Sequence, residues 1–346
     1  MVSSLNDAVW LAWIEKLLVG PAPHSVPVAL PPSRFHCRLD DQPNHLTPGH
    51  EFRSQAWEDL ADRPLFVHPH LRLTRDGELP LSEEISFLDN FAPECDIAWI
   101  NDSGSEVLQP FWLSAEVGAI LADALPGDPA PLNLPREVRP ALIMAGILVA
   151  ENYEAKRRAR WAQIIGRCGA EFREKGYAPL GGLIHPFLVA ALRRYYRYMI
   201  RAGRLPLGDS QSSRRYIAHN ESVARFFHHQ LTATMTAVAG EKVKPSYVYM
   251  GSYKDGAKLE KHTDREQCEF SMTFCLDFSP EPENETSWPL RLHTDSGTVT
   301  VFQRIGDALF YRGCQLPHSR DPLPHGRTST SIFFHYVRED FAGPLD

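Results

Sequence analysis

In the middle of the chain, apolar side chains recur every three or four positions, which is the spacing of amphipathic helices. Leu188, Leu192 and Tyr195, for example, fall on one stripe of a helical projection. Helices are expected at residues 113–125, 135–148, 151–176, 183–203 and 220–240. Ser114 and Asn220 are the expected N-caps of the first and the last of these helices.

After about residue 240 the pattern changes to short runs rich in β-branched and aromatic residues, separated by turn residues. Strands are expected there at residues 245–253, 268–278, 288–295, 298–313 and 329–337. Residues 20–110 are rich in Pro, His and Asp and favour only short strands, at 64–73 and 95–100. Helices followed by strands predict an α+β fold, most simply a β-sandwich or barrel flanked by helices.

Composition narrows the function classes. The formal net charge of -7 argues against a nucleic-acid partner, which normally requires a basic face. The six cysteines are scattered without a CxxC pair, as expected for free thiols in a reducing compartment. The first 20 residues keep acidic side chains among apolar ones and predict an amphipathic helix instead of a signal peptide, and no run is long enough to span a membrane. We therefore expect a cytoplasmic protein, and a homo-oligomer is compatible with the sequence.

The candidate chemistry lies in the strand-rich part of the chain. The segment "KLEKHTDREQCEF" places His262 and Asp264 two positions apart, and such positions point to the same side of an extended chain. His318 follows the predicted strand "GDALFYRG". Two imidazoles and one carboxylate on one face form the ligand set of non-haem Fe(II) oxygenases. Because the chain has 15 histidines, an HxD pair also arises by chance, so the surrounding motifs must decide.

Those motifs resemble one enzyme superfamily. "YKDGAKLEKHTD", from Tyr253 to Asp264, resembles the pattern Y-x-x-G-x-x-hydrophobic-x-x-H-x-D of prolyl-hydroxylase-like 2-oxoglutarate/Fe(II) dioxygenases. His318 with Arg327 and Ser329 is similar to the distal His and R-x-S motif of the penicillin-synthase-like branch. "GDALFYRG" resembles the strand that precedes the distal His.

The resemblance covers about residues 180–340. It implies a double-stranded β-helix, also called a jelly-roll or cupin-like barrel, flanked by helices. The catalytic domain would occupy residues 176–346, behind a mostly helical accessory region at residues 1–175.

The resemblance also implies the metal chemistry. His262, Asp264 and His318 would bind Fe(II), with 2-oxoglutarate and O2 as cosubstrates, and the reaction would hydroxylate an unactivated C–H bond. Halogenases of the same superfamily have a small residue at the position of Asp264, so the carboxylate favours hydroxylation, with desaturation or cyclisation as further options.

For the cosubstrate, the resemblance implies that Arg327 pairs with the distal carboxylate of 2-oxoglutarate, because a guanidinium fork matches a carboxylate. Ser329 and Tyr253 would add hydrogen bonds; the alternative for Tyr253 is an aromatic residue of the barrel core. Arg320 is a second cation near His318 and a candidate for the cosubstrate or for the substrate.

The substrate is less defined. The resemblance to bacterial hydroxylases suggests an amino acid, either free, as in proline or pipecolate hydroxylation, or bound to a peptide or carrier. Arg265 and Glu266 follow the HxD pair and are candidates for the substrate mouth. Residues 108–150 also resemble a small winged-helix module, which would bind a leader peptide by adding it to a sheet edge. The alternatives are a helical cap and, for the whole chain, a non-catalytic cupin-like metal-binding protein.

Overall fold

The structure is a computed structural model that describes residues 30–39, 63–75 and 87–346. The amphipathic helix predicted for the first 20 residues lies outside these ranges.

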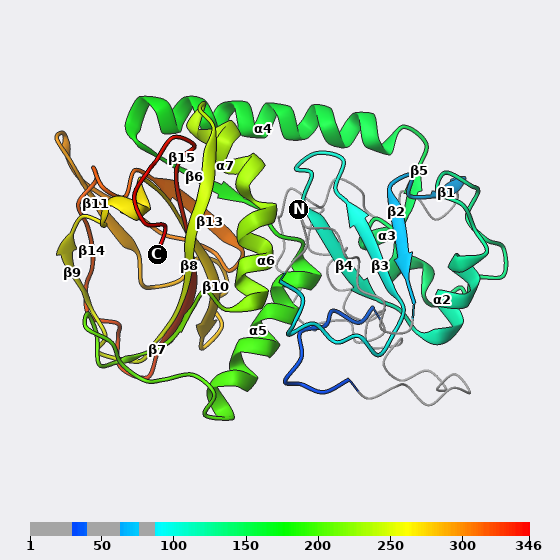
Figure 1. Ribbon diagram of the computed structural model, residues 1–346, viewed down its shortest axis with the longest axis horizontal. Coiled ribbons are helices and arrows are strands. Elements are labelled where there is room, and N and C mark those ends of the chain that lie inside the picture. Colours follow the sequence, from blue (N-terminus) through cyan, green and yellow to red (C-terminus); the bar gives the residue numbers. More distant parts are fainter. Residues whose placement is uncertain (1–29, 40–62, 76–86) are drawn as a thin grey trace.

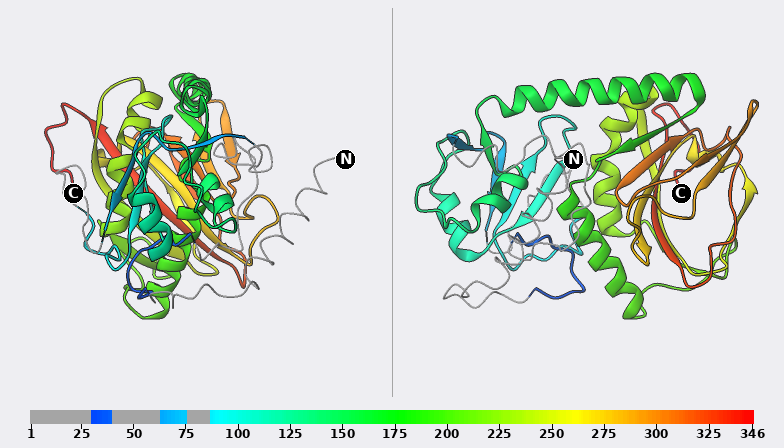
Figure 2. Two further views of the ribbon diagram at one scale, coloured as in Figure 1. Left: turned by 90° about the vertical axis from the view of Figure 1, so that its right-hand side faces the viewer. Right: turned by 180° about the vertical axis from the view of Figure 1, so that it is seen from behind.

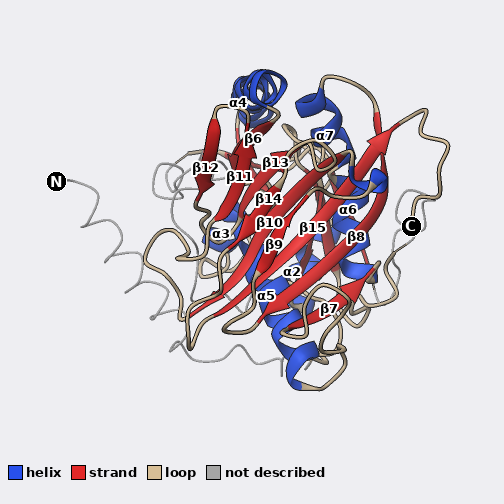
Figure 3. Cartoon of the chain, turned by 90° about the vertical axis from the view of Figure 1, so that its left-hand side faces the viewer, coloured by secondary structure: helices blue, strands red, loops and turns tan. Residues whose placement is uncertain are grey.

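Two antiparallel sheets make up most of the second half of the chain (Figure 1). The larger sheet has the strand order β6-β13-β10-β15-β8-β7, and the smaller has the order β12-β11-β14-β9. The strands are β6 Tyr177–Gly181, β7 Arg215–His219, β8 Val243–Tyr253, β9 Leu259–His262, β10 Phe270–Ser279, β11 Leu290–Thr294, β12 Gly297–Val301, β13 Asp307–Tyr311, β14 His318–Arg320 and β15 Thr328–Arg338. Figure 3 shows β10, β15 and β8 side by side in the larger sheet. The α+β class with antiparallel strands is confirmed.

The two sheets are joined by a small apolar cluster. Leu290 and Leu292 of β11, in the smaller sheet, pack with Leu309 and Tyr311 of β13, in the larger one. All four side chains are at most 2% exposed, so the space between the sheets is a packed core at this end.

Helices line the side of the larger sheet that faces the first half of the chain (Figure 1). They are α5 Pro186–Arg201, α6 Ser222–Gln230 and α7 Thr232–Ala239. A further helix, α4 Tyr153–Lys175, contacts the edge strand β6 and runs across both halves. Helix α5 starts with Pro186, which is tolerated because the first-turn N–H has no intrahelical partner. Asp277 of β10 accepts hydrogen bonds from Arg193 at 2.9 Å and from Arg197 at 2.6 Å, which ties α5 to the sheet.

The described part of the first half mixes strands and helices. It contains the antiparallel sheet β2-β3-β4, the two-stranded pair β1-β5, and two short helices. These elements are β1 Leu65–Val67, β2 Leu71–Thr74, β3 Ile97–Asn101, β4 Leu108–Trp112, α2 Ala115–Ala122, α3 Arg139–Met144 and β5 Leu148–Ala150. A mostly helical accessory region is therefore not confirmed for the described residues.

One apolar core continues from the first half into the helices of the second. The ring of Phe35 lies 5.9 Å from that of Trp112, 6.2 Å from Tyr195 and 6.1 Å from Phe227. Figure 2 shows the same contiguity of the two halves from behind. The helices α5 and α6 are thus packed against the described N-terminal elements.

The helix boundaries differ from the sequence predictions at three places. The helix predicted at 135–148 is shortened to α3, and its last predicted residue belongs to β5. The N-cap of α6 is Glu221 and not Asn220: the Glu221 carboxylate accepts from the N–H groups of Val223 and Ala224, whereas Asn220 has a φ of 48°. The predicted helix 220–240 is interrupted at Leu231, so it forms α6 and α7. The Ser114 cap of α2 is confirmed.

Six strands were not predicted, namely β4, β5, β6, β7, β9 and β14. Each has five residues or fewer. Among the described helices, none combines the length and apolar content needed to cross a membrane.

Candidate metal centre

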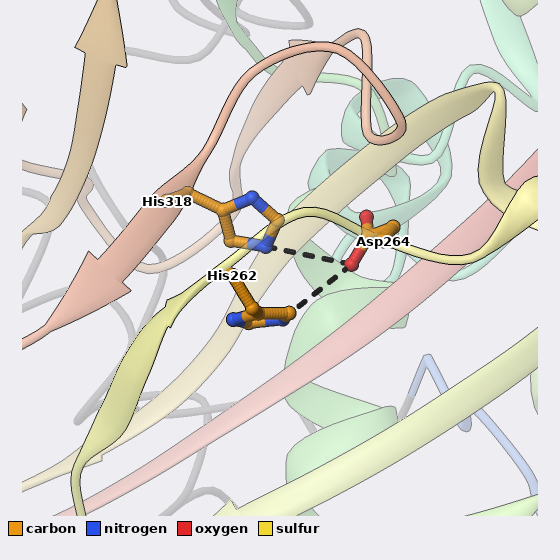
Figure 4. Close-up of side chains that lie close together, drawn as sticks. All are labelled: His262, Asp264 and His318. Carbon is orange, nitrogen blue, oxygen red and sulfur yellow. Dashed lines mark ion pairs between the residues drawn. The ribbon is translucent and has the colours of Figure 1, made fainter.

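His262, Asp264 and His318 converge at the smaller sheet (Figure 4). His262 is the last residue of β9 and His318 the first of β14, and the antiparallel register places them opposite each other. The Oδ1 atom of Asp264 lies 3.6 Å from Nε2 of His262 and 3.5 Å from Nε2 of His318. The three ligand atoms all lie within 4.8 Å of one another, which a single metal ion can bridge.

Backbone carbonyls orient both imidazoles. Nδ1 of His262 lies 2.8 Å from the carbonyl oxygen of Glu260, and Nδ1 of His318 lies 3.0 Å from that of Leu316. In this arrangement each Nδ1–H donates to a carbonyl, so each Nε2 lone pair is available for a metal. Both rings therefore present the same atom, Nε2, as a possible metal ligand.

The carboxylate of Asp264 is held in its charged form. Burial alone would raise its pKa, but hydrogen bonds from His262 and His318 and the charge of His318 hold the pKa of this carboxyl well below its usual range. In return, the hydrogen bond to Asp264 raises the pKa of His262. A metal ion at this place would bind one anionic oxygen and two neutral imidazoles, releasing any proton on the rings.

Hydrogen bonds around Asp264 hold the second oxygen of its carboxylate, Oδ2, in place. Ser271 of β10 donates from Oγ to Oδ2 of Asp264 at 2.9 Å, and the same Oγ lies 3.0 Å from Nδ1 of His335 on β15. The backbone N–H of Asp264 donates to the carbonyl of Gly313 at 2.9 Å. These contacts turn Oδ1 toward the histidines.

Gly313 allows the chain to approach Asp264 closely. A Cβ atom at position 313 would lie 2.4 Å from Oδ2 of Asp264 and 2.6 Å from Oγ of Ser271. Both distances are too short for non-bonded atoms, so the site requires glycine there.

A second group of possible ligands shares Asp264, with Cys268 and His335. It is less suited to a metal. Burial, and then the charge of Asp264, raises the pKa of the Cys268 thiol to about 12, whereas metal binding needs the thiolate. Nδ1 of His335 is already engaged by Ser271. The donor set of His262, Asp264 and His318 therefore fits Fe(II) better among the described residues.

The predicted cosubstrate residues lie at one end of the barrel. Tyr253 on β8 and Ser329 on β15 are direct cross-strand partners, and both are buried. The hydroxyl of Tyr253 accepts a hydrogen bond of 2.9 Å from Nη1 of Arg215. Arg327 lies just before β15 and is partly exposed, and its side chain makes no hydrogen bond or ion pair with the described residues.

The three candidates for substrate or cosubstrate contacts lie in different environments. The guanidinium of Arg265 lies 4.5 Å from the ring centre of Tyr247 and donates from Nε to its hydroxyl at 3.2 Å. Glu266 begins the short 3-10 helix Glu266–Cys268 and is exposed. Arg320, the last residue of β14, is only 7% exposed.

Sequence reasoning missed several residues of this site. Ser271 and His335 lie on predicted strands but had no sequence signal of contact with Asp264. Gly313 ends the "GDALFYRG" segment five residues before His318, and a glycine at the end of this predicted strand was an available signal.

No protein-family model matches the chain, and no curated protein matches its sequence. Solved structures with a similar backbone include a prolyl hydroxylase from Trichoplax adhaerens in complex with a hypoxia-inducible-factor peptide fragment, at 10% identity and a TM-score of 0.45 over 55% of this chain and 95% of that chain. A prolyl-4-hydroxylase from Pseudomonas putida is 16% identical, with a TM-score of 0.41 over 51% and 99% of the two chains. The α-ketoglutarate-dependent epimerase SnoN from nogalamycin biosynthesis is 16% identical, with a TM-score of 0.42 over 50% and 82%. At this level of similarity, the function must be argued from the side chains.

Proposed function

We propose that this protein is a non-haem Fe(II)- and 2-oxoglutarate-dependent oxygenase of the hydroxylase type. The observation that carries the proposal is the convergence of Nε2 of His262, Nε2 of His318 and Oδ1 of Asp264 within 4.8 Å. Two histidines and one carboxylate on one face leave the opposite face open to other ligands. We assign the two sheets to a double-stranded β-helix, in a catalytic domain at 176–346 behind an accessory region at 1–175.

With Fe(II) bound, 2-oxoglutarate and O2 would supply the oxidising chemistry, which converts a C–H bond to C–OH and yields succinate and CO2. The chain itself has a positioning role. His262 and His318 present neutral nitrogens because their Nδ1–H groups are bound to carbonyls. Asp264 adds a negative oxygen whose direction is set by Ser271.

Asp264 also favours hydroxylation over halogenation. With a metal bound, the carboxylate of Asp264 would be a ligand in place of a halide, which favours transfer of hydroxyl. The residues that follow it, Arg265 and Glu266, are the proposed lining of the substrate mouth.

The cosubstrate would be held by donors at the Tyr253 end of the barrel. Tyr253 and Ser329 offer hydroxyl groups from neighbouring strands. Sequence spacing favours Arg327 as the partner of the distal carboxylate, and Arg320 is the competing candidate.

The proposed substrate is an amino acid, free or bound to a peptide or carrier, in a biosynthetic pathway. A module at 108–150 that binds a leader peptide, and a non-catalytic metal-binding protein, remain alternatives. No contact among the described residues favours either of them.

The test is turnover with the purified protein, Fe(II), 2-oxoglutarate and a panel of amino acids and short peptides under 18O2. We expect succinate in an amount equal to a product that has gained one labelled oxygen atom. The matched blank is Asp264→Ala, which keeps both histidines. Succinate no higher than this blank across the panel, or a chlorinated product in chloride buffer, would overturn the proposal.

A further inference from the structure

We propose that Arg320, and not Arg327, forms the ion pair with the distal carboxylate of the 2-oxo acid, with the Tyr253 hydroxyl as a second donor. This inference rests on the proposed function and assigns one end of the same site. It departs from the sequence spacing, which favoured Arg327.

Arg320 is a buried cation without a carboxylate partner among the described residues. Its side chain is 7% exposed. Its one hydrogen bond runs from Nη1 to the backbone carbonyl of Trp288, and its guanidinium lies 4.6 Å from the centre of the Trp288 ring. A carbonyl and an aromatic face solvate a cation only in part, so an unpaired charge here is costly.

Other buried arginines of the barrel half are neutralised. Arg193 pairs with Asp277 and Glu281, and Arg215 pairs with Asp209. The contrast indicates that the fold tolerates buried guanidinium groups by giving them carboxylates. For Arg320, the chain supplies none in its described part, and a bound dicarboxylate would complete the pair.

The position of Arg320 connects it to the metal centre. It lies two residues after His318 on β14, so both side chains leave the strand on the same side, with their Cα atoms roughly 7 Å apart. His318 and Arg320 are both buried, whereas Ser319 between them is half-buried. A ligand attached to the metal by its 2-oxo acid end can therefore extend along the strand toward Arg320.

Tyr253 lies beside this cluster with a proton to donate. Its ring is 5.0 Å from that of Trp288, the residue that contacts Arg320. Since the Tyr253 hydroxyl already accepts from Arg215, its own proton is free for an acceptor. One carboxylate can thus receive hydrogen bonds from both the guanidinium and the phenol.

Arg327 has a weaker physical case. It is partly exposed at the turn before β15. Water can solvate a guanidinium there, so its charge requires no buried anion. The nine-residue separation of Arg327 from His318 in the sequence does not indicate whether its side chain is buried.

The test compares two ligands in the wild type and three arginine variants. 2-Oxovalerate has the chain length of 2-oxoglutarate but a methyl group in place of the distal carboxylate. Calorimetric titrations with Zn(II)-loaded protein measure binding without turnover. The wild type should prefer 2-oxoglutarate by about 100-fold, since a buried charge pair typically contributes that much.

Arg320→Met should reduce this preference to within about 3-fold and leave the affinity for 2-oxovalerate unchanged. The matched control Arg327→Met, an identical substitution seven residues away, should keep the full preference. Arg320→Lys, which keeps the charge but loses the fork, should retain an intermediate preference and guards against misfolding of the methionine variant. A role in folding alone would lower the Tm without changing the preference.

The outcomes separate the two proposals. If Arg327→Met removes the preference and Arg320→Met keeps it, this inference is wrong while the oxygenase assignment stands. If all three arginine variants keep the preference, Arg320 has no role in carboxylate binding. If the metal-loaded wild type binds neither 2-oxo acid, the proposed function itself fails.

Discussion

His262 and His318 are cross-strand partners in the antiparallel pair β9–β14, and their rings lie 4.4 Å apart between centroids. The separation of the two imidazoles is therefore set by strand register. A shift of the pairing by one residue would turn one ring to the opposite face of the sheet and abolish the site. Although β9 has only four residues and β14 only three, the metal centre depends on this pairing.

Replacing a metal ligand tests the centre directly. His262→Ala, Asp264→Ala and His318→Ala should each abolish turnover and weaken Co(II) binding at least about 100-fold, because even residues that only orient ligands change affinity by 10- to 100-fold. The measurement is titration with Co(II), followed by its visible absorption. His325→Ala is the matched control, since that side chain is 99% exposed. Wild-type affinity in one of the three variants would remove that residue from the ligand set.

Ser271→Ala tests the orientation of Asp264. The variant keeps all three ligands but removes the hydrogen bond to Oδ2 and leaves Nδ1 of His335 without its partner. We expect metal affinity to fall by about 10- to 100-fold. Thr330→Ala, another buried hydroxyl residue whose Oγ1 donates to Ser252, is the control for general packing loss. Equal metal affinity in both variants would show that Ser271 does not orient the carboxylate.

Gly313→Ala tests the close approach to Asp264. A methyl group there would displace the carboxylate and Ser271, so we expect loss of metal binding and a lower Tm. Gly166→Ala is the matched control, because it lies on the exposed side of α4 with no atom within 4 Å of the added carbon. It should raise the free energy of unfolding by about 0.5–1 kcal/mol through helix propensity. An unchanged Tm and metal affinity in Gly313→Ala would contradict the geometry.

His68 should make the protein less stable in acid. Burial lowers its pKa from 6.5 to about 4, since the side chain is fully enclosed between its neighbours. Below pH 6.5, His68 becomes protonated in the unfolded chain but stays neutral in the folded one. The free energy of unfolding therefore falls as the pH drops from 6.5 toward 4. The loss from this residue would be about 3 kcal/mol over that window.

Denaturant unfolding of His68→Gln at several pH values measures this effect. The variant should lack this part of the acid loss, so its difference from the wild type should shrink as the pH falls. His325→Gln, an exposed position, should keep the wild-type slope. A slope in His68→Gln equal to that of the wild type would show that folding does not lower the pKa of His68.

The spacing of apolar residues was sufficient to predict the long helices and strands but not the short ones. Helix α4 combines a 23-residue pattern with Gly176 at its C-terminal end, so several independent signals agree. Strand β9 reads "LEKH", three polar residues in four, and its strand character comes from pairing with β14. The N-cap of α6 was displaced by one position because tertiary contacts hold Asn220, whose side chain accepts from Val248 N–H.

The residues of the candidate site likewise divide into those that the sequence predicted and those that it did not. His262 and Asp264 are two residues apart and were visible in the sequence, whereas Ser271 and His335 reach Asp264 only through the register of β10 and β15. Arg320 was recognised as a candidate, but its burial could not be read from its spacing. Burial separates it from Arg327, and burial is a property of the whole fold.

The long helix α4 also restricts motion between the two halves of the molecule. Its 23 residues span about 34 Å and cross both halves of the molecule (Figure 1). Near one end, Arg157 forms a buried ion pair with Asp102 of the N-terminal part; near the other, the ring of Phe172 lies 6.3 Å from Phe270 of the larger sheet. A helix with contacts to a different half near each end resists hinge motion, because separating the two halves would break a buried ion pair or an aromatic contact. We therefore expect the traffic of substrate and product to depend on the loops at the barrel rim, with the two halves moving as one body.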